Sequence, residues 1–263
     1  MLEHLNHHNE SALRQMIEKA KTDPSVCTIS DIDELHVDTV TLHERLLNRH
    51  IRLMGYSGCT SDEVRAAGGT QIAYRKFYPQ LNDEQWDQFM ERVRMSNMVN
   101  RNGDLYHPEQ VRIANEVFGS GNFLGYMTAR PYTEQVVNTT EKDLFDRLGL
   151  LCAPVMLRPE GVRPEESGIW KVEQMHAIRT AAGVQNMILI DDSISTAKQV
   201  VRYNEELGQI GIRQILYKGP LTVPSLQSGK FVPDESLGIY AADWDEMPEV
   251  FDRIREQCHL IQN

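Results

Sequence analysis

The sequence contains no apolar run near the roughly 20 residues that a membrane-spanning helix needs. Its first residues, MLEHLNHHNESALRQMIEKAK, have neither the apolar core nor the small-residue cleavage site of a secretory signal. Cysteine is scarce, and the four cysteines form no CxxC pair: Cys27, Cys59, Cys152 and Cys258. We therefore expect a chain that neither crosses nor inserts into a membrane, with isolated reduced thiols and a cytoplasmic location.

Basic residues are also in deficit, with 27 Lys and Arg against 38 Asp and Glu and a net charge of −11. This balance argues against a nucleic-acid partner, because such proteins gather Lys and Arg into one face that displaces counterions. The basic stretch ERVRM at 91–95 lies among acids on a helical pattern, which is typical of a solvated helix face. A flexible polar N-terminus explains His4, His7 and His8 better than a metal site does.

Short apolar runs, each followed by polar or turn residues, predict buried parallel strands. They lie at 25–30, 122–127, 153–158, 186–190, 212–218 and 237–242. Helical patterns alternate with them at 133–149, 170–183 and 195–208, and each of these ranges ends in glycine, a common helix stop. The alternation predicts an α/β fold with a doubly wound, Rossmann-like parallel sheet. The Pro-, Gly- and Ser-rich segment 217–236 is predicted to be a surface loop.

About 90 residues with little strand character separate the first two predicted strands. Helix periodicity recurs within them at 39–56, 83–97 and 108–119. A loop of that length without structure is improbable, so the segment predicts an inserted helical subdomain. A chain of 263 residues is long enough for a core domain that carries a smaller one.

Chemically informative residues follow the predicted strands or begin the predicted helices: Asp31, Asp33, Thr128, Lys171, Asp191 and Asp192. Ligands of open parallel sheets bind outside the carboxyl ends of the strands, so we expect these residues to share one rim. Each of them alone has a structural explanation, as a turn residue, a helix cap or a solvated surface charge. The ordered set, with every member at a strand end or helix start, favours a functional site.

Clustered carboxylates suit Mg²⁺, a hard cation held by a few acids. A divalent cation balances the repulsion between the acids and attracts a phosphate that they would otherwise repel. One Asp of the pair can then attack phosphorus, while the second, two residues later, serves as general acid and then base. Thr128 and Lys171 would hold the transferring oxygens and neutralise their charge.

The chain resembles the haloacid dehalogenase-like hydrolases, mostly Mg²⁺-dependent phosphatases. DIDELHVDT at 31–39 is similar to the family's DxDGTLxDT motif and matches it at Asp31, Asp33, Asp38 and Thr39. FLGYMTARP is similar to the second motif, an apolar strand that ends in Thr or Ser. Lys171 stands about 20 residues before LIDDS, as the third-motif lysine does before the fourth motif.

The resemblance implies hydrolysis of a small phosphorylated metabolite, with Asp31 as nucleophile and Asp33 as general acid and base. It implies that Thr128 and Lys171 bind phosphate. It also implies Mg²⁺ on Asp31, the backbone carbonyl of Asp33 and Asp192, with Asp191 as a possible further ligand. The strand bearing Asp31 is expected between those bearing Thr128 and Asp192.

The resemblance further implies an α/β core at 1–36 and 119–263, with a helical cap inserted at 37–118. The metal ion and the phosphate-binding residues contact only the phosphoryl group, so the cap is expected to select the leaving group. Arg130 and Arg158 follow strand ends on the same rim and are candidates to bind a second anionic group of the substrate. Ordinary surface salt bridges are the alternative for both.

The first motif departs from the family pattern, because Glu34 and Leu35 stand where Gly and Thr are usual and His36 follows them. Glycine there permits a tight turn, so Glu34 either distorts the turn or projects a charge toward the cap. These departures keep open a catalytically impaired relative that binds a phosphorylated ligand in a binding or regulatory role. A dehalogenase or phosphonate hydrolase is a weaker alternative. A receiver-like signalling domain also clusters acids and a lysine, but it has no insertion of this length.

Overall fold

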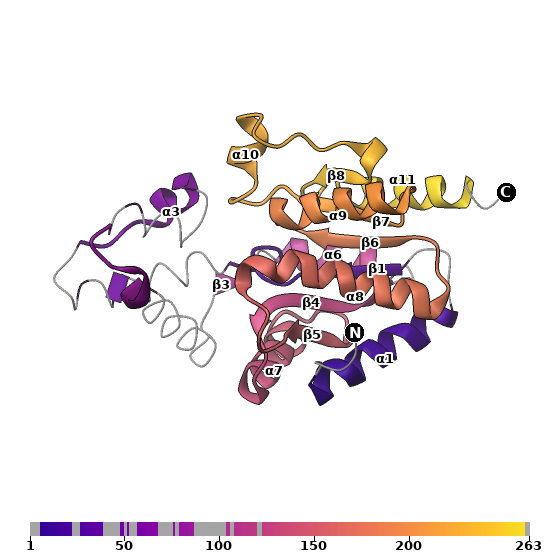
Figure 1. Ribbon diagram of the computed structural model, residues 1–263, viewed down its shortest axis with the longest axis horizontal. Helices are drawn as coiled ribbons and strands as arrows, with labels where there is room; N and C mark the ends of the chain where they lie inside the picture. Colours follow the sequence, from indigo (N-terminus) through magenta and orange to yellow (C-terminus); the bar gives the residue numbers. More distant parts are fainter. Residues whose placement is uncertain are drawn as a thin grey trace.

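The computed structural model describes residues 6–22, 27–38, 48–49, 52, 57–67, 76, 79–86, 104–105, 108–119 and 123–260. A six-stranded sheet with the order β5-β4-β1-β6-β7-β8 lies at its centre, and every neighbouring pair is parallel (Figure 1). The strands are β1 (Cys27–Ser30), β4 (Phe123–Pro131), β5 (Val155–Arg158), β6 (Met187–Asp191), β7 (Ile212–Tyr217) and β8 (Ile239–Ala242). The predicted fold class and all six predicted strands are confirmed, and β1 lies between β4 and β6 as expected.

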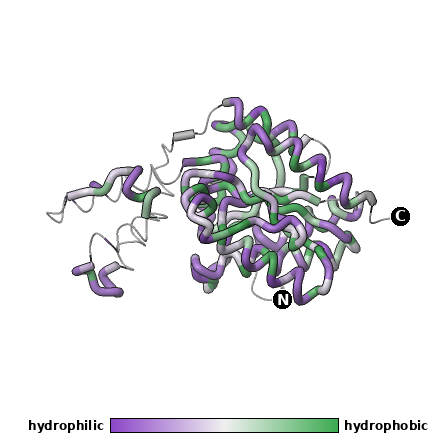
Figure 2. Tube along the Cα trace, turned by 90° about the horizontal axis from the view of Figure 1, so that it is seen from above, coloured by the Kyte–Doolittle hydropathy of each residue, from purple (hydrophilic) through white to green (hydrophobic). Residues whose placement is uncertain are grey.

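Helices cover both faces of the sheet, which is why its strands are apolar on both sides. In β6, Met187 and Leu189 pack into one core cluster, while Ile188 and Ile190 pack into the other. The first cluster is closed by α1 (His7–Thr22), α8 (Ser167–Ala182) and α9 (Ile194–Leu207). The second is closed by α6 (Pro108–Gly119), α7 (Glu134–Glu141) and α11 (Met247–Leu260). Apolar segments accordingly run through the middle of the molecule, with polar ones outside (Figure 2).

The predicted helices at 170–183 and 195–208 correspond to α8 and α9. Both end at a glycine in the left-handed conformation, Gly183 at φ 71° and Gly208 at φ 68°, where a Cβ would be strained. The predicted helix at 133–149 corresponds to α7 followed by a π-helical turn, η1 (Lys142–Arg147). The part of the chain that the structure describes contains no helix long and apolar enough to cross a membrane.

The expected flexible N-terminus is wrong, because residues 7–22 form helix α1. Its buried residues recur at helical spacing and pack under the sheet: Ala12, Leu13, Met16 and Ala20. The His8 ring Nε2 lies 2.8 Å from the Val155 carbonyl oxygen, so this histidine ties α1 to β5. His4 lies outside the described residues.

Two further departures from the sequence predictions concern the C-terminal third. The predicted loop at 217–236 contains a short helix, α10 (Val223–Gln227), and a 3₁₀ turn, η3 (Glu235–Leu237). The closing helix α11 was not predicted. Its buried Met247, Phe251 and Ile254 belong to the core cluster of the α6 face.

The insertion leaves the core through a two-stranded ribbon. Strand β2 (Val37–Asp38) pairs antiparallel with β3 (Asp104–Leu105), so the chain departs and returns at one place beside the carboxyl end of β1. Helix α3 (Ser61–Ala67) lies away from the sheet on this side (Figure 1). Most of the predicted helices at 39–56 and 83–97 lies outside the described residues.

Helix α6, at the end of the predicted cap range 37–118, packs on the sheet beside α11. Its Ile113, Ala114, Val117 and Phe118 are buried in the same cluster as Ile188 and Ile190 of β6. The predicted helix at 108–119 is therefore confirmed as a helix, and its packing partners are those of the core.

Candidate active site

The chain turns sharply after β1 and thereby brings the first motif to the rim of the sheet. The Asp31 amide donates to the Ile190 carbonyl oxygen at 2.8 Å, which continues the pairing of β1 with β6. The next turn is closed when the His36 amide donates to the Ile32 carbonyl at 2.8 Å. Within it Glu34 adopts φ 59°, the left-handed region that favours glycine. The Glu at this position is thus held in a strained turn conformation.

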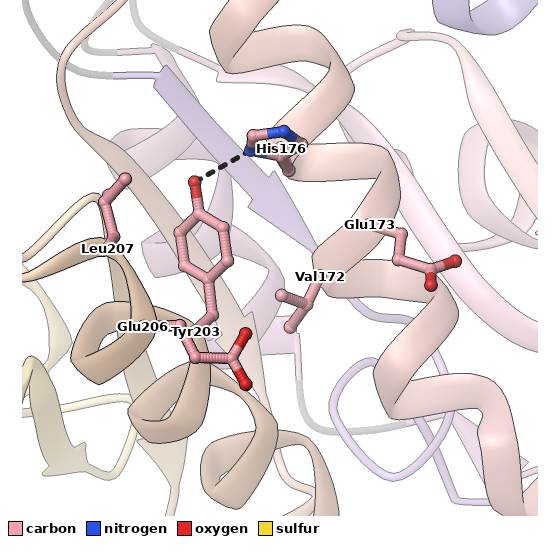
Figure 3. Close-up of a pocket in the computed structure, with 6 residues that line it drawn as sticks. All are labelled: Val172, Glu173, His176, Tyr203, Glu206 and Leu207. Atoms are coloured by element: carbon pink, nitrogen blue, oxygen red, sulfur yellow. Dashed lines mark hydrogen bonds between the residues drawn. The ribbon is translucent and has the colours of Figure 1, made fainter. Parts of the chain in front are cut away.

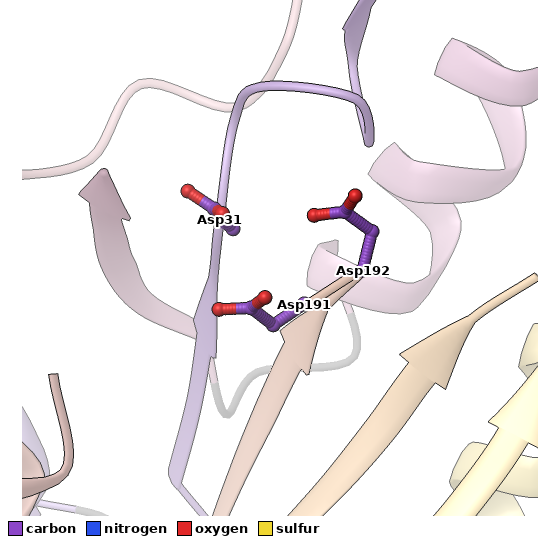
Figure 4. A group of neighbouring side chains, drawn as sticks. All are labelled: Asp31, Asp191 and Asp192. Atoms are coloured by element: carbon purple, nitrogen blue, oxygen red, sulfur yellow. The ribbon is translucent and has the colours of Figure 1, made fainter. Parts of the chain in front are cut away.

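Three carboxylates gather at the carboxyl ends of β1 and β6. Asp31, Asp191 and Asp192 each offer an oxygen atom, and these atoms lie within 4.8 Å of one another. Asp191 and Asp192 extend toward the segment that carries Asp31 (Figure 4). Asp31 and Asp191 are buried, and Asp192 is half-buried. Sequence reasoning placed all three on one rim, and the structure brings them together.

Lys171 lies between two of these acids. Its Nζ is 2.7 Å from Asp31 Oδ2 and 2.7 Å from Asp191 Oδ2, and the side chain is only 2% exposed. Lys171 lies in the second turn of α8, which runs alongside the sheet toward β6. One ammonium group therefore partly compensates three carboxylates.

Burial is the largest influence on the charges of this site. Burial raises the pKa of Asp31 to about 7, against the lowering effect of Lys171 and with a further rise from Asp191. Burial also raises the pKa of Asp192 well above its ordinary value, and Asp191 and Asp31 add to the rise. Burial opposes the charged form of Lys171, but Asp191 and Asp31 outweigh it and raise its pKa. The excess negative charge of the cluster makes it receptive to a cation.

The donor set fits Mg²⁺. Asp191 has a partner on each oxygen, since Oδ2 meets Lys171 and Oδ1 accepts from the Ser193 amide at 2.7 Å. Asp31 instead buries its Oδ1 without a hydrogen-bond partner, which is costly unless something positive lies beside it. A hard cation bound by Asp31 Oδ1 and Asp192 would remove that cost. Asp191 is therefore placed to orient Lys171.

Asp33 points to a different set of partners. Arg130, near the end of β4, reaches its carboxylate with Nε at 2.9 and 3.0 Å and with Nη2 at 2.6 Å. Thr128 Oγ1 donates to Asp33 Oδ2 at 3.3 Å. The remaining guanidinium nitrogen of Arg130, Nη1, donates to Thr140 Oγ1 of α7 at 2.9 Å. Because alternate residues of a strand share a face, Thr128 and Arg130 meet Asp33 together.

The two arginines proposed as substrate contacts have internal partners. Arg130 is 3% exposed, and its Nε and Nη2 donate to the Asp33 carboxylate. Arg158, at the end of β5, donates from Nε to the Ala129 carbonyl at 2.9 Å and from Nη1 to the Val162 carbonyl. Arg158 therefore ties β4 to the segment that follows β5. Their assignment to a substrate anion stays a prediction.

Sequence reasoning missed several residues that shape the site. Thr222 Oγ1 donates to the Asp192 carbonyl at 2.7 Å, from a segment predicted only as a surface loop. His36 Nε2 lies 2.9 Å from Ser30 Oγ, and its ring lies 5.3 Å from that of Trp244. Burial lowers the pKa of His36 to about 3, so the ring is neutral. The only sequence signal for His36 was its departure from the motif, and Thr222 gave none.

Comparison with known proteins supports the fold. No family model matches the sequence, and no curated protein matches it. A protein assigned as a phosphoglycolate phosphatase from Lactobacillus delbrueckii subsp. bulgaricus superposes with a TM-score of 0.60 at 15% identity, covering 86% of this chain and 97% of that one. The chain has the haloacid dehalogenase-like fold.

Two further solved structures agree with this assignment. A haloacid dehalogenase-like family hydrolase from Streptococcus pneumoniae gives a TM-score of 0.56 at 14% identity, covering 86% of this chain and 99% of that one. A phosphonoacetaldehyde hydrolase-like protein from Oleispira antarctica gives 0.55 at 12% identity, covering 89% and 94%. In all three comparisons the matched region covers at least 94% of the solved structure.

Proposed function

We propose that this chain is a haloacid dehalogenase-like phosphatase that hydrolyses a small phosphomonoester. The observation that carries the proposal is the surroundings of Asp31. Its Oδ2 is held by Lys171 at 2.7 Å, and its Oδ1 is buried without a partner at the rim of the sheet. A carboxylate fixed on one side and unsatisfied on the other is positioned to react.

The proposed reaction has two steps. Asp31 attacks phosphorus, an aspartyl-phosphate forms, and the alcohol leaves with a proton from Asp33. In the second step Asp33 removes a proton from water, the water oxygen attacks phosphorus, and inorganic phosphate leaves as Asp31 is restored. Lys171 and Thr128 donate to the phosphoryl oxygens in both steps.

Asp31, Asp192 and the backbone carbonyl of Asp33 would hold Mg²⁺. When bound, the ion supplies positive charge that neutralises the acids and attracts the phosphoryl group. The pair formed by Asp191 and Lys171 serves a separate purpose, because it keeps an ammonium group beside the nucleophile without drawing on the remaining oxygen of Asp31.

The proposed division of the chain is a core at 1–36 and 119–263 with a cap inserted at 37–118. Because α6 packs with the core, we assign the covering role to 39–107. The ribbon of β2 and β3 joins this part to the rim immediately after the first motif. Closure over the rim would exclude water from the aspartyl-phosphate and select the leaving group, for which a small phosphorylated metabolite is the proposed class.

The test is phosphate release by the full chain with Mg²⁺, from p-nitrophenyl phosphate and a panel of phosphorylated metabolites. Asp31→Asn is expected to reduce turnover by at least about a thousandfold, since no nucleophile remains. Asp252→Asn, on the exposed face of α11, serves as the matched control and is expected to leave turnover unchanged. Turnover by Asp31→Asn at the rate of the parent chain would overturn the proposal.

A second candidate, a phospho-ligand binder with little or no turnover, rests on the contact between Arg130 and Asp33. A guanidinium on both carboxylate oxygens favours the ionised form, which suits a base but opposes donation of a proton to the leaving group. Thermal stabilisation by phosphate and Mg²⁺ is expected of an enzyme and of a binder alike. Stabilisation without phosphate release from any member of the panel would favour the binder.

A further inference from the structure

The turn between β6 and α9 carries Asp192, a proposed metal ligand, and its backbone is held by two side chains from later in the sequence. Gln214 Nε2 donates to the carbonyl oxygens of Asp191 and Ser193, each at 3.3 Å. Thr222 Oγ1 donates to the carbonyl oxygen of Asp192 itself at 2.7 Å. Three successive carbonyls of this turn are thus fixed by β7 and by the segment that follows it.

Gln214 makes these contacts from a fully buried position in β7. Both of its partners are carbonyl oxygens, which only accept hydrogen bonds, so the amide nitrogen must face the turn. The amide oxygen Oε1 is consequently buried with no partner among the described residues, which is unfavourable. An apolar side chain would avoid this penalty, so donation to the turn is what glutamine contributes at this position.

Thr222 is the N-cap residue of α10, a position where a threonine hydroxyl commonly accepts from an amide of its own helix. It makes no such bond to the described amides of α10. The side chain is buried, and its hydroxyl donates to the Asp192 carbonyl instead. A Cβ built on Gly219 would lie 3.6 Å from the Glu34 carbonyl oxygen, so the segment that carries Thr222 also lies beside the first-motif turn.

The helices on either side of the turn are packed against each other. A Cβ built on Gly168 of α8 would lie 3.1 Å from Thr196 Cα, so α8 closely approaches the first turn of α9. Farther along the two helices, His176 Nδ1 lies 3.0 Å from the Tyr203 hydroxyl (Figure 3). Because α8 also carries Lys171, the lysine and the start of α9 belong to one packed unit. The short turn before α9 is where the direction of the metal-binding carboxylate is set.

We infer that Gln214 and Thr222 are positioning residues for the metal ligand Asp192. Groups that hold a ligating residue in place before the ion arrives strengthen metal binding without contacting the ion. Asp31 is held through its carboxylate, by Lys171, whereas Gln214 and Thr222 act on Asp192 through the backbone. The inference rests on the proposed metal site and names the residues that set its affinity.

Binding of Mn²⁺ to the full chain without substrate tests this inference, because Mn²⁺ shares the preference of Mg²⁺ for octahedral oxygen ligands. The electron paramagnetic resonance signal of the free ion gives the dissociation constant, and the relevant site is the one lost in Asp192→Asn. Thr222→Val keeps the shape but removes the donor, and Gln214→Met removes the amide. Each is expected to raise the dissociation constant by about tenfold to a hundredfold. Thr222→Ser keeps a hydroxyl and is expected to bind Mn²⁺ as tightly as the parent chain.

A matched control and a stability measurement separate positioning from a structural role. Thr22→Val removes an exposed hydroxyl that donates to the Lys19 carbonyl at the same 2.7 Å, and it is expected to leave Mn²⁺ binding unchanged. Urea unfolding in EDTA should place Gln214→Met near the parent chain, because the buried Oε1 is removed together with the two donations. If Thr222→Val does not fold, Gln214→Met decides the matter.

The outcomes distinguish this inference from the proposals on which it rests. Tight Mn²⁺ binding by the parent chain with unchanged affinity in either folded variant would overturn the inference alone. Absence of a tight Mn²⁺ site in the parent chain would overturn the metal site and the inference together. Because binding is measured without turnover, a failure of the proposed phosphatase activity is seen separately.

Discussion

The guanidinium of Arg130 lies against both carboxylate oxygens of Asp33, with contacts of 2.6, 2.9 and 3.0 Å. The two residues are 97 positions apart: Arg130 lies in β4, and Asp33 lies in the turn that follows β1, the parallel neighbour of β4. Thr140 holds the other side of the guanidinium, so the contact has little freedom to vary. The proposed general acid and base is therefore positioned by an arginine.

The first prediction concerns this contact. Arg130→Lys keeps the charge but loses the planar fork, so Asp33 is no longer fixed in one orientation. We expect kcat for p-nitrophenyl phosphate to fall by about tenfold to a hundredfold with little change in KM, because a positioning contact is lost. Steady-state kinetics measure both values. Thr140→Val is the companion variant, with a smaller loss in the same direction, and a change confined to KM in Arg130→Lys would instead indicate a substrate contact.

The second prediction concerns the stability of the metal-free protein. Burial raises the pKa of Asp31 from 3.8 to about 7, so the folded state holds this proton more tightly than the unfolded state. The stabilisation from this group is complete below about pH 4 and is lost as the pH rises through about 7. Asp31→Asn is therefore expected to raise the free energy of unfolding at pH 8 by on the order of 1–3 kcal/mol.

Urea unfolding in EDTA at pH 5, 6, 7 and 8 measures this difference. The gain from Asp31→Asn should shrink steadily toward pH 5, because the parent carboxyl is then protonated. Asp252→Asn supplies the control for loss of a surface charge. A gain that is constant across the four pH values would contradict the prediction, since it would not arise from titration of Asp31.

The third prediction concerns the strained turn of the first motif. Glu34 adopts φ 59°, and its charge adds to the repulsion that raises the pKa of Asp192. Glu34→Gly is expected to stabilise the protein by about 1 kcal/mol, because glycine adopts this conformation without strain. Glu34→Ala removes the carboxylate but keeps the Cβ, so comparison of their urea midpoints separates strain from charge. Equal stability of the two variants would show that backbone strain is not the cause.

The fourth prediction concerns the insertion. Asp38 and Asp104 are paired across the ribbon, so a short Gly-rich linker can replace 39–103 without moving β2 or β3. We expect a cooperatively folding core whose phosphate release shows a changed and broader ranking of substrates. A deletion that extends to 118 also removes the buried side chains of α6, and it is expected to lower the melting temperature strongly. An unchanged ranking in the shorter deletion would show that the insertion does not select the substrate.

The sequence by itself determined the sheet and the rim. Each of the six strands is a short, continuous apolar run, because a strand buried on both faces of a sheet is apolar along its whole length. Such a run is recognised by being too short for a helix. Since parallel strands end at one edge, the positions of Asp31, Asp191 and Asp192 after their strands were enough to bring them together. The spacing of Ala12, Leu13, Met16 and Ala20 also indicates helix α1. The polar residues between them led instead to the expectation of a flexible N-terminus.

Only the tertiary structure decided which partner each charge has. Lys171 could have faced solvent or phosphate, and its contact with Asp31 depends on how α8 packs against the sheet. Arg130 and Asp33 are 97 residues apart, and Trp244, which donates to the Leu35 carbonyl, is 209 residues from it. Hydrophobic periodicity fixes which face of an element is buried, but it carries no information on which polar group a distant segment will meet. That choice depends on the packing of whole elements, and so does the contact of Thr222 with the Asp192 carbonyl.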